Sequence, residues 1–139
     1  MAHPAFRNGL DPTWATDGRR LAFTRDTHVY LARRDGSGLR RLTSGREESS
    51  PSWSPDGRRI AYRRAVRGAT TAIAVLDLRS SRVTQIAKLA SDVPLIWSPD
   101  GTRLAWSDSY RGTKYVFVAR ADGRGRPRPI TIGEFPDWR

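Results

Sequence analysis

Apolar positions along the chain come in short runs rather than in long amphipathic stretches. The runs at 59–63, 71–76 and 114–119 are rich in aliphatic and aromatic residues, with charged residues beside or within them. Such runs are typical of strands. Asp-Gly and Arg-Gly pairs separate many of them, and these pairs favour hairpin turns. No segment keeps a helical period over about ten positions, so the pattern predicts an all-β chain.

One phrase of apolar and polar positions recurs at long intervals. The sequence PSWSPDGRRIAY at 51–62 returns as PLIWSPDGTRLAW at 94–106, in a weaker form as PTWATDGRRLAF at 12–23, and in part as PDWR at 136–139. A spacing of about forty residues is that of one four-stranded propeller blade. The tryptophans that mark the copies are Trp14, Trp53, Trp97 and Trp138.

Each repeat is expected to form four antiparallel strands. The strand with the tryptophan comes first, a Thr-Asp-Gly or Pro-Asp-Gly turn follows, and three further strands complete the sheet. We therefore predict three four-stranded β-propeller blades at about 10–50, 51–93 and 94–135, plus the first strand of a fourth at 136–139. The whole chain, 1–139, would be a single propeller segment.

The recurring residues of the phrase have a structural interpretation. An aspartate favours a turn by bonding its own backbone two residues on, and glycine accepts a positive φ without a Cβ clash. We expect turn formers, not catalytic or metal-binding groups, at Asp17, Asp56, Asp100, Gly18, Gly57 and Gly101. The four tryptophans are expected to pack between blades rather than to form ligand cages.

The repeat resembles that of the TolB-type β-propeller. The resemblance lies in Pro-x-Trp-Ser-Pro-Asp-Gly-x-Arg-Ile-Ala-Tyr, followed by an aromatic or aliphatic strand, Asp-Gly and Leu-Thr, and it covers about residues 10–139. It implies a rigid platform of six blades whose loops at the channel mouths bind a protein partner. It also implies an exported or periplasmic protein, although residues 1–20 show no apolar core of a signal peptide. The separate N-terminal domain of TolB has no counterpart in the sequence.

Three blades do not close a ring, because propellers have about four to eight. Two explanations stay open. The chain is the C-terminal part of a longer propeller, which we favour, or two copies form a homodimer that completes a six-bladed ring. The strand at 136–139 fits the end of a longer ring, and in a homodimer it would compete with the partner's first strand. In isolation the chain is expected to self-associate, because open blade flanks expose apolar surface.

Composition limits the classes of partner. The net charge is +11 and almost all basic residues are arginine, a balance that suits acidic partners or polyanions. Because the arginines flank the predicted turns, we interpret them as solvated, and nucleic acid is not an expected partner. The chain has no cysteine, which excludes disulfides and cysteine-based metal sites. It also lacks an apolar run of about eighteen residues, so membrane insertion is not expected.

The glutamates share one place in the repeat. Glu47, Glu48 and Glu134 all lie shortly before the proline of a repeat, and Asp11 and Asp92 lie in the same zone. In a propeller this zone enters the innermost strand at one mouth of the channel. We predict an acidic cluster there, formed by Glu47, Glu48, Asp92 and Glu134, that attracts a cation or a basic partner segment. Solvated loop carboxylates that balance nearby arginines are the alternative.

No phrase in the sequence indicates catalysis. There is no Gly-x-Ser-x-Gly elbow, no phosphate-binding Gly-Lys-Ser loop and no His-Glu-x-x-His, and His3 and His28 are the only histidines. We expect no catalytic residue, cofactor or metal ligand, and predict a non-catalytic protein-binding scaffold or a fragment of one. Two alternatives stay open. One is the propeller segment of a prolyl-oligopeptidase-like serine hydrolase without its catalytic domain, which the coding sequence after Arg139 would reveal. The other is an arginine-rich polyanion-binding module.

Overall fold

Three four-stranded sheets make up the part of the chain that the computed structural model describes, residues 8–68, 70–90 and 93–132. The first sheet contains β1 (Leu10–Trp14), β2 (Arg20–Arg25), β3 (His28–Arg33) and β4 (Arg40–Arg41). The second contains β5 (Arg46–Trp53), β6 (Arg59–Val66), β7 (Thr70–Asp77) and β8 (Val83–Leu89). The third contains β9 (Ile96–Trp97), β10 (Arg103–Tyr110), β11 (Thr113–Arg120) and β12 (Arg128–Ile132).

Neighbouring strands are antiparallel and follow chain order in every sheet. The described residues contain no helix, and thus none long and apolar enough to cross a membrane. The prediction of an all-β fold with three four-stranded antiparallel sheets is confirmed. The predicted first strand of a fourth blade, at 136–139, lies outside the described residues.

Local turn chemistry sets the hairpins. Tyr110 pairs with Thr113 across a two-residue turn in which Arg111 and Gly112 have φ of 51° and 78°. Positive φ at both central residues matches the right-handed twist of the flanking strands. Asp26 and Thr27 connect β2 to β3 in the same way, with φ of 47° and 63°.

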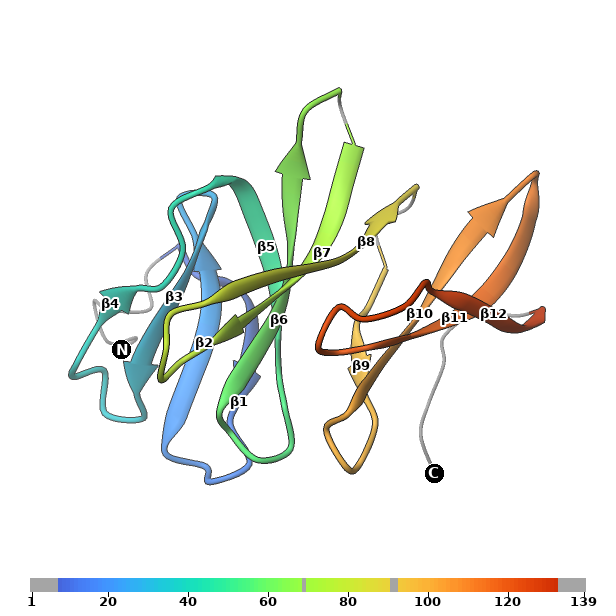
Figure 1. Cartoon of the computed structure of the whole chain (residues 1–139). Helices are drawn as coiled ribbons and strands as arrows, with labels where there is room; N and C mark the ends of the chain where they lie inside the picture. Colours follow the sequence, from blue (N-terminus) through green and yellow to red (C-terminus); the bar gives the residue numbers. More distant parts are fainter. Residues whose placement is uncertain (1–7, 69, 91–92, 133–139) are drawn as a thin grey trace.

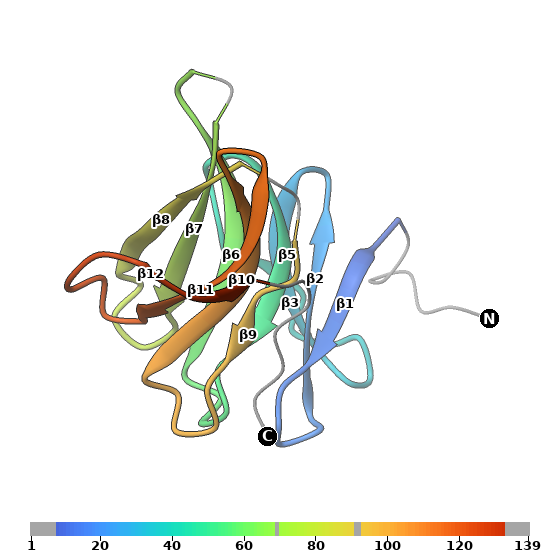
Figure 2. The ribbon, with the colours of Figure 1, turned by 90° about the vertical axis from the view of Figure 1, so that its right-hand side faces the viewer.

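The sheets stand side by side as an open arc, with the first sheet at the left of Figure 1 and the third at the right. The Pro-Asp-Gly or Thr-Asp-Gly turns of all three sheets lie at the lower end of that view. Figure 2 looks onto the third sheet, with β9 and β10 in front of the strands of the second. One end of the arc therefore collects the turns of the recurring phrase, and the opposite end collects the segments that lead into β1, β5 and β9.

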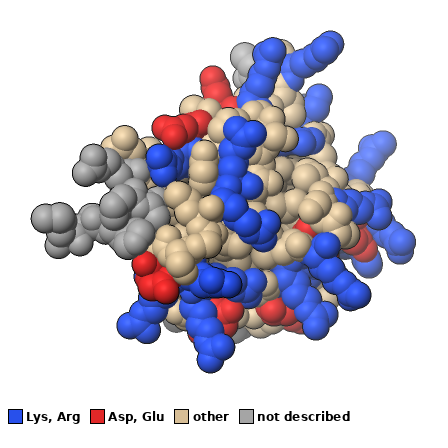
Figure 3. Space-filling view, turned by 90° about the vertical axis from the view of Figure 1, so that its left-hand side faces the viewer, with Lys and Arg blue, Asp and Glu red and all other residues tan. Residues whose placement is uncertain are grey.

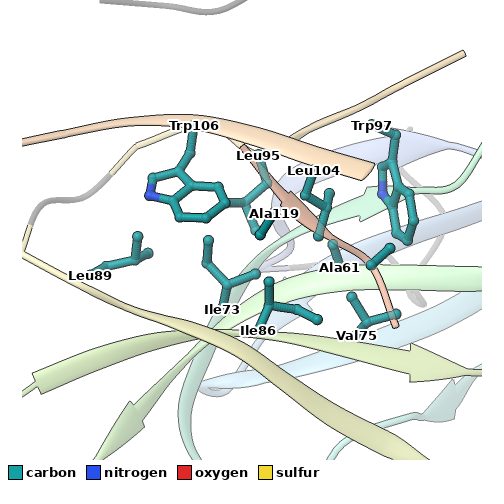
Figure 4. Packing of buried hydrophobic residues seen from close by; sticks show 11 residues of the cluster. Ala61, Ile73, Val75, Ile86, Leu89, Leu95, Trp97, Leu104, Trp106 and Ala119 are labelled. Carbon is teal, nitrogen blue, oxygen red and sulfur yellow. The ribbon is translucent and has the colours of Figure 1, made fainter. Parts of the chain in front are cut away.

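Alternate side chains of the second sheet pack on its two neighbours. Ile60 lies in one cluster with Ala22 and Leu31 of the first sheet, whereas the next residue, Ala61, packs with the third. Figure 4 shows this second junction, where Ile73 and Ile86 face Trp106, Leu104 and other residues of the third sheet. Each large apolar side chain buried there contributes about 1.5–3 kcal/mol. The junctions between sheets are therefore the hydrophobic core.

Three strands differ in length from the sequence expectation. β4 and β9 have two residues each, while β5 begins at Arg46, well before the Pro51 of the phrase. The register of β5 against β6 shifts twice, between Arg46 and Glu48 and between Ser49 and Ser52. These β-bulges extend the strand through the segment that the sequence alone placed in a loop.

Candidate functional site

The inner strands of the first two sheets carry a bulge at the same place in the repeat. The register shifts between Leu10 and Thr13 in β1 and between Ser49 and Ser52 in β5. Asp11 and Ser50, each three residues before the tryptophan of its repeat, have φ of 50° and 52°. Non-glycine residues with positive φ are uncommon, and bulges often re-aim side chains at functional sites. The strain marks this end of the arc as a candidate site.

A polar network joins the two bulges. Oδ2 of Asp11 accepts hydrogen bonds from Oγ1 of Thr24 at 3.3 Å, from the backbone N–H of Ser50 at 3.3 Å and from Oγ of Ser50 at 3.4 Å. The Arg63 guanidinium donates from Nη2 to Oγ of Ser50. Carboxylate, hydroxyl and guanidinium thus form a chain of contacts from the first sheet to the second.

Arg63 is the unusual member of this network. It follows Tyr62 in β6, and the corresponding positions after Phe23 and Trp106 hold the small residues Thr24 and Ser107. Arg63 is only 9% exposed, although a buried charge is costly unless it is paired. Burial lowers the pKa of its guanidinium, and the charge of Asp11 partly offsets that effect. The group nevertheless stays a cation at any ordinary pH.

A hollow of about 370 Å³ opens beside this network, and we call it the mouth hollow. It collects residues from the entries of all three inner strands and from β6. Its lining is Asp11, Pro12, Ser50, Pro51, Ser52, Arg63, Val93, Pro94 and Leu95. Volumes of this order suit small ligands or a few residues of a peptide. The mouth hollow offers a carboxylate acceptor, a guanidinium donor and an apolar wall formed by the segment that leads into β9.

The predicted acidic residues have different surroundings. Glu48 is 2% exposed, and its Oε2 lies 3.0 Å from Nδ1 of His28. Its backbone N–H also donates to the carbonyl of Thr27 at 2.8 Å, which ties the first sheet to the second. Glu47 is exposed, with φ of 39°, and lines a second hollow of about 300 Å³ that shares Arg63 with the mouth hollow. Asp92 and Glu134 lie outside the described residues.

The aspartates of the recurring turn bond their own backbone. Asp17, Asp56 and Asp100 accept the N–H two residues on, from Arg19 at 2.8 Å, Arg58 at 3.1 Å and Thr102 at 2.9 Å. Hydrogen bonds from Ser98 and Thr102 lower the pKa of Asp100 to about 2. Gly18, Gly57 and Gly101 all have positive φ between these partners, at 64°, 68° and 69°. These contacts explain the aspartates as turn formers, at the end of the arc opposite to the mouth hollow.

The tryptophans mark the edges of the sheets. Trp53 and Trp97 are each 7% exposed, and each packs in the junction with the preceding sheet. Trp14 is 51% exposed, because the described chain has no sheet before the first. Trp138 lies outside the described residues.

Sequence reasoning placed Asp11 in the right zone but missed Ser50 and Arg63. The sequence does contain a signal for Arg63. In the first and third repeats a small polar residue follows the aromatic residue of the second strand, whereas the second repeat has Arg63 at this position. Among the described residues, no three histidine, aspartate or glutamate side chains gather as metal ligands would. The groups present at the mouth hollow, the Asp11 carboxylate, the Ser50 hydroxyl and the Arg63 guanidinium, can form hydrogen bonds and ion pairs.

Comparison with known proteins agrees with the fold of three antiparallel sheets. A family model, the TolB beta propeller domain, matches residues 5–138, and no curated protein matches the chain. The fold is similar to TolB from Acinetobacter baumannii, with a TM-score of 0.77 and 22% identity over 88% of this chain and 32% of that one. It is also similar to a TolB-assigned protein from Agrobacterium tumefaciens, with a TM-score of 0.76 and 24% identity over 92% and 48% of the two chains.

A peptidase is among the similar structures. Pyrococcus horikoshii acylaminoacyl peptidase gives a TM-score of 0.65 and 18% identity over 88% of this chain and 25% of that one.

The chain spans about a third to a half of the length of the two TolB structures. Sequence identities this low show a shared fold alone. The family model covers nearly the whole chain, and with the three-sheet arc it establishes that this chain belongs to the TolB β-propeller domain family.

Proposed function

We propose that this chain is a non-catalytic, protein-binding segment of a TolB-like propeller. The observation that carries the proposal is the mouth hollow, where Asp11 and the buried Arg63 flank a space that is open to solvent. Propeller loops at a channel mouth stand on a rigid scaffold, which makes them suited to recognition. The bound element would be an extended segment of a partner protein.

The lining of the mouth hollow supplies what such a segment needs. Asp11 can accept a backbone N–H or a basic side chain, and Arg63 can donate to a carbonyl or a carboxylate. Leu95 and Val93 give an apolar wall for a side chain of the segment. The exposed Glu47 would add negative charge beside the hollow, and we propose the same rim position for Asp92 and Glu134. A partner segment with a basic residue fits this acidic rim.

A phage-displayed library of linear peptides tests the proposal. Peptides selected on the wild-type chain are measured by calorimetry against Asp11→Asn, with Asp35→Asn, an exposed turn residue, as the matched control. Loss of a hydrogen bond to a charged group weakens binding about tenfold or more. We expect that loss for Asp11→Asn and none for Asp35→Asn. Equal affinities for the two variants would contradict binding at the mouth hollow.

A peptidase-type propeller segment is the second candidate, because acylaminoacyl peptidase shares the fold. In that case the segment would gate substrate access to a hydrolase domain. The coding sequence beyond Arg139 decides this candidate, since a hydrolase domain encoded there would support it. If no hydrolase domain is encoded there, the result would favour the protein-binding proposal over this candidate.

Polyanion binding through arginine is a third candidate. Figure 3 shows Lys and Arg side chains spread over the side of the molecule formed by the first sheet. At the other end of the arc, several arginines surround a hollow of about 600 Å³ beside β11, namely Arg103, Arg120, Arg124, Arg126 and Arg128. Retention on heparin with a steep salt dependence would support this candidate. Elution from heparin at the same salt concentration as a protein of similar net charge that does not bind polyanions specifically would contradict this candidate.

A further inference from the structure

Both internal junctions of the arc use one repeated hydrogen bond. Nε1 of Trp53 donates to the carbonyl of Thr13 in the preceding sheet at 3.1 Å, and Nε1 of Trp97 donates to that of Ser52 at 3.0 Å. Thr13 and Ser52 each directly precede the tryptophan of their own sheet. The second sheet thus presents an indole donor to the first sheet and a carbonyl acceptor to the third.

An arginine completes each junction from the acceptor side. Cζ of Arg20 lies 4.8 Å from the centroid of the Trp53 ring, and its Nη2 donates to the carbonyl of Gly57 at 3.1 Å. Arg59 repeats this arrangement over Trp97 at 5.0 Å and donates to Gly101 at 2.6 Å. Each arginine therefore contacts two neighbouring parts of the next sheet. It stacks on the tryptophan of the first strand through a cation–π interaction, and it donates a hydrogen bond to the turn that follows that strand. These arginines hold one blade to the next.

Within residues 8–132, as far as the structure describes them, each end of the arc carries one half of this contact without its counterpart. At the first sheet Trp14 is 51% exposed, against 7% for Trp53 and Trp97, and Gly18 stands where Gly57 and Gly101 accept their bonds. At the third sheet Ile96 and Arg103 occupy the positions of the acceptor residue and the stacking arginine. No tryptophan ring of the described residues lies under Arg103. The hollow beside it also offers the apolar Val118 and Ile130.

We propose that a second copy of this chain supplies both missing halves. Trp14 would donate to the carbonyl of Ile96 of the partner subunit, and Arg103 of the partner subunit would stack on Trp14 and bond Gly18. The arithmetic of closure selects two copies. Two arcs give six blades, within the four to eight of known propellers, while three arcs give nine. The first and third sheets, seen in Figures 3 and 2, become partners at two identical junctions.

Sedimentation velocity on the full chain tests this interface. The wild type should sediment at twice the 15.6 kDa of one chain. Truncation of a central interface tryptophan weakens an interface about thirtyfold, so Trp14→Ala should weaken association about a thousandfold across two junctions. Trp138→Ala and Arg19→Ala are the matched controls, because one removes the tryptophan of the last repeat and the other a neighbouring arginine. Arg19→Ala should associate as the wild type does, and Trp138→Ala should associate no more weakly than the wild type, because it removes the tryptophan of a strand that would compete with the partner's first strand. Circular dichroism should show that all variants fold.

A mixing experiment tests whether Arg103 and Trp14 touch. Trp14→Ala and Arg103→Ala chains together can form a pair with one intact junction, which neither variant can form alone. Random mixing alone makes the mixed pair about twofold tighter than the geometric mean of the two self-affinities. If the two residues interact, the mixed pair binds more tightly than this statistical expectation. Equality with the statistical expectation would overturn the proposed contact. A wild-type mass of one chain, a mass above two chains, or a loss of association in Trp138→Ala rather than Trp14→Ala would overturn the proposal.

Discussion

Replacement of Trp53 by alanine should destabilise the chain more than any single change at a turn. Trp53 is 7% exposed and lies in the cluster with Ile60, Ala22 and Leu31. Truncation of a buried aromatic residue costs about 3–5 kcal/mol. The indole hydrogen bond to Thr13 adds about 1 kcal/mol, and Arg20 loses its stacking partner. We expect a loss of about 4–5 kcal/mol, which approaches the whole stability of many domains of this size.

Urea denaturation followed by far-ultraviolet circular dichroism measures this loss. Dilute samples should be used, so that association between chains does not contribute to the free energy of unfolding. Trp14→Ala is the matched control, because half of that side chain already lies in water, and we expect it to cost about 1 kcal/mol or less. Trp53→Phe keeps most of the ring and loses the N–H donor, so it should cost about 1–2 kcal/mol.

The ranking of these variants by lost free energy of unfolding tests whether Trp53 is a core residue between blades. A Trp53→Ala variant that loses no more stability than Trp14→Ala would refute the assignment of Trp53 to the core between blades. A Trp53→Phe variant as damaged as Trp53→Ala would show that the indole hydrogen bond, rather than packing, stabilises the junction.

Three further predictions concern the turns and the chemistry. Asp56→Ala removes the acceptor for Ser54 and for the backbone of Arg58 and should cost about 1 kcal/mol in the same denaturation assay; a cost above that of Trp53→Ala would contradict the turn assignment. The pKa values of Asp17, Asp56 and Asp100 are lowered on folding, to about 2 for Asp100, so their contribution is present above about pH 4 and lost as the pH falls toward 2. An acid titration of the wild type and Asp100→Asn should show this loss for the wild type more than for the variant, and identical curves would contradict it. The purified chain should hydrolyse neither peptide nor ester substrates, and turnover that disappears in His28→Ala would contradict the non-catalytic proposal.

The fold could be predicted because its signals are local and repeated. Pro-Asp-Gly turns and short β-branched runs determine hairpins within a few residues, as at Arg111 and Gly112. The period of about forty residues then groups the strands into blades. The length of β5 could not be predicted, because the bulges at Glu47 and Ser50 arise from pairing with β6 and from contacts with the first sheet.

The candidate site depends on contacts between distant residues. Asp11 and Ser50 are far apart in the sequence and meet only when the first two sheets pack. Glu48 reads as a surface carboxylate in the sequence, yet it is buried against His28 because β5 starts early. The arginines read as solvated charge, and two of them, Arg20 and Arg59, instead hold the tryptophan of the next sheet. The pairing partner of each charge is tertiary information that local patterns do not contain.

Recognition of a partner segment at the mouth hollow is the central claim. The most direct measurement is a titration of the ¹⁵N-labelled chain with a library-selected peptide, followed by amide chemical shifts. The proposal predicts the largest changes at Ser50, Arg63 and Leu95, which line the mouth hollow. Changes confined to the opposite end of the arc, at the turns of Gly18, Gly57 and Gly101, would contradict it.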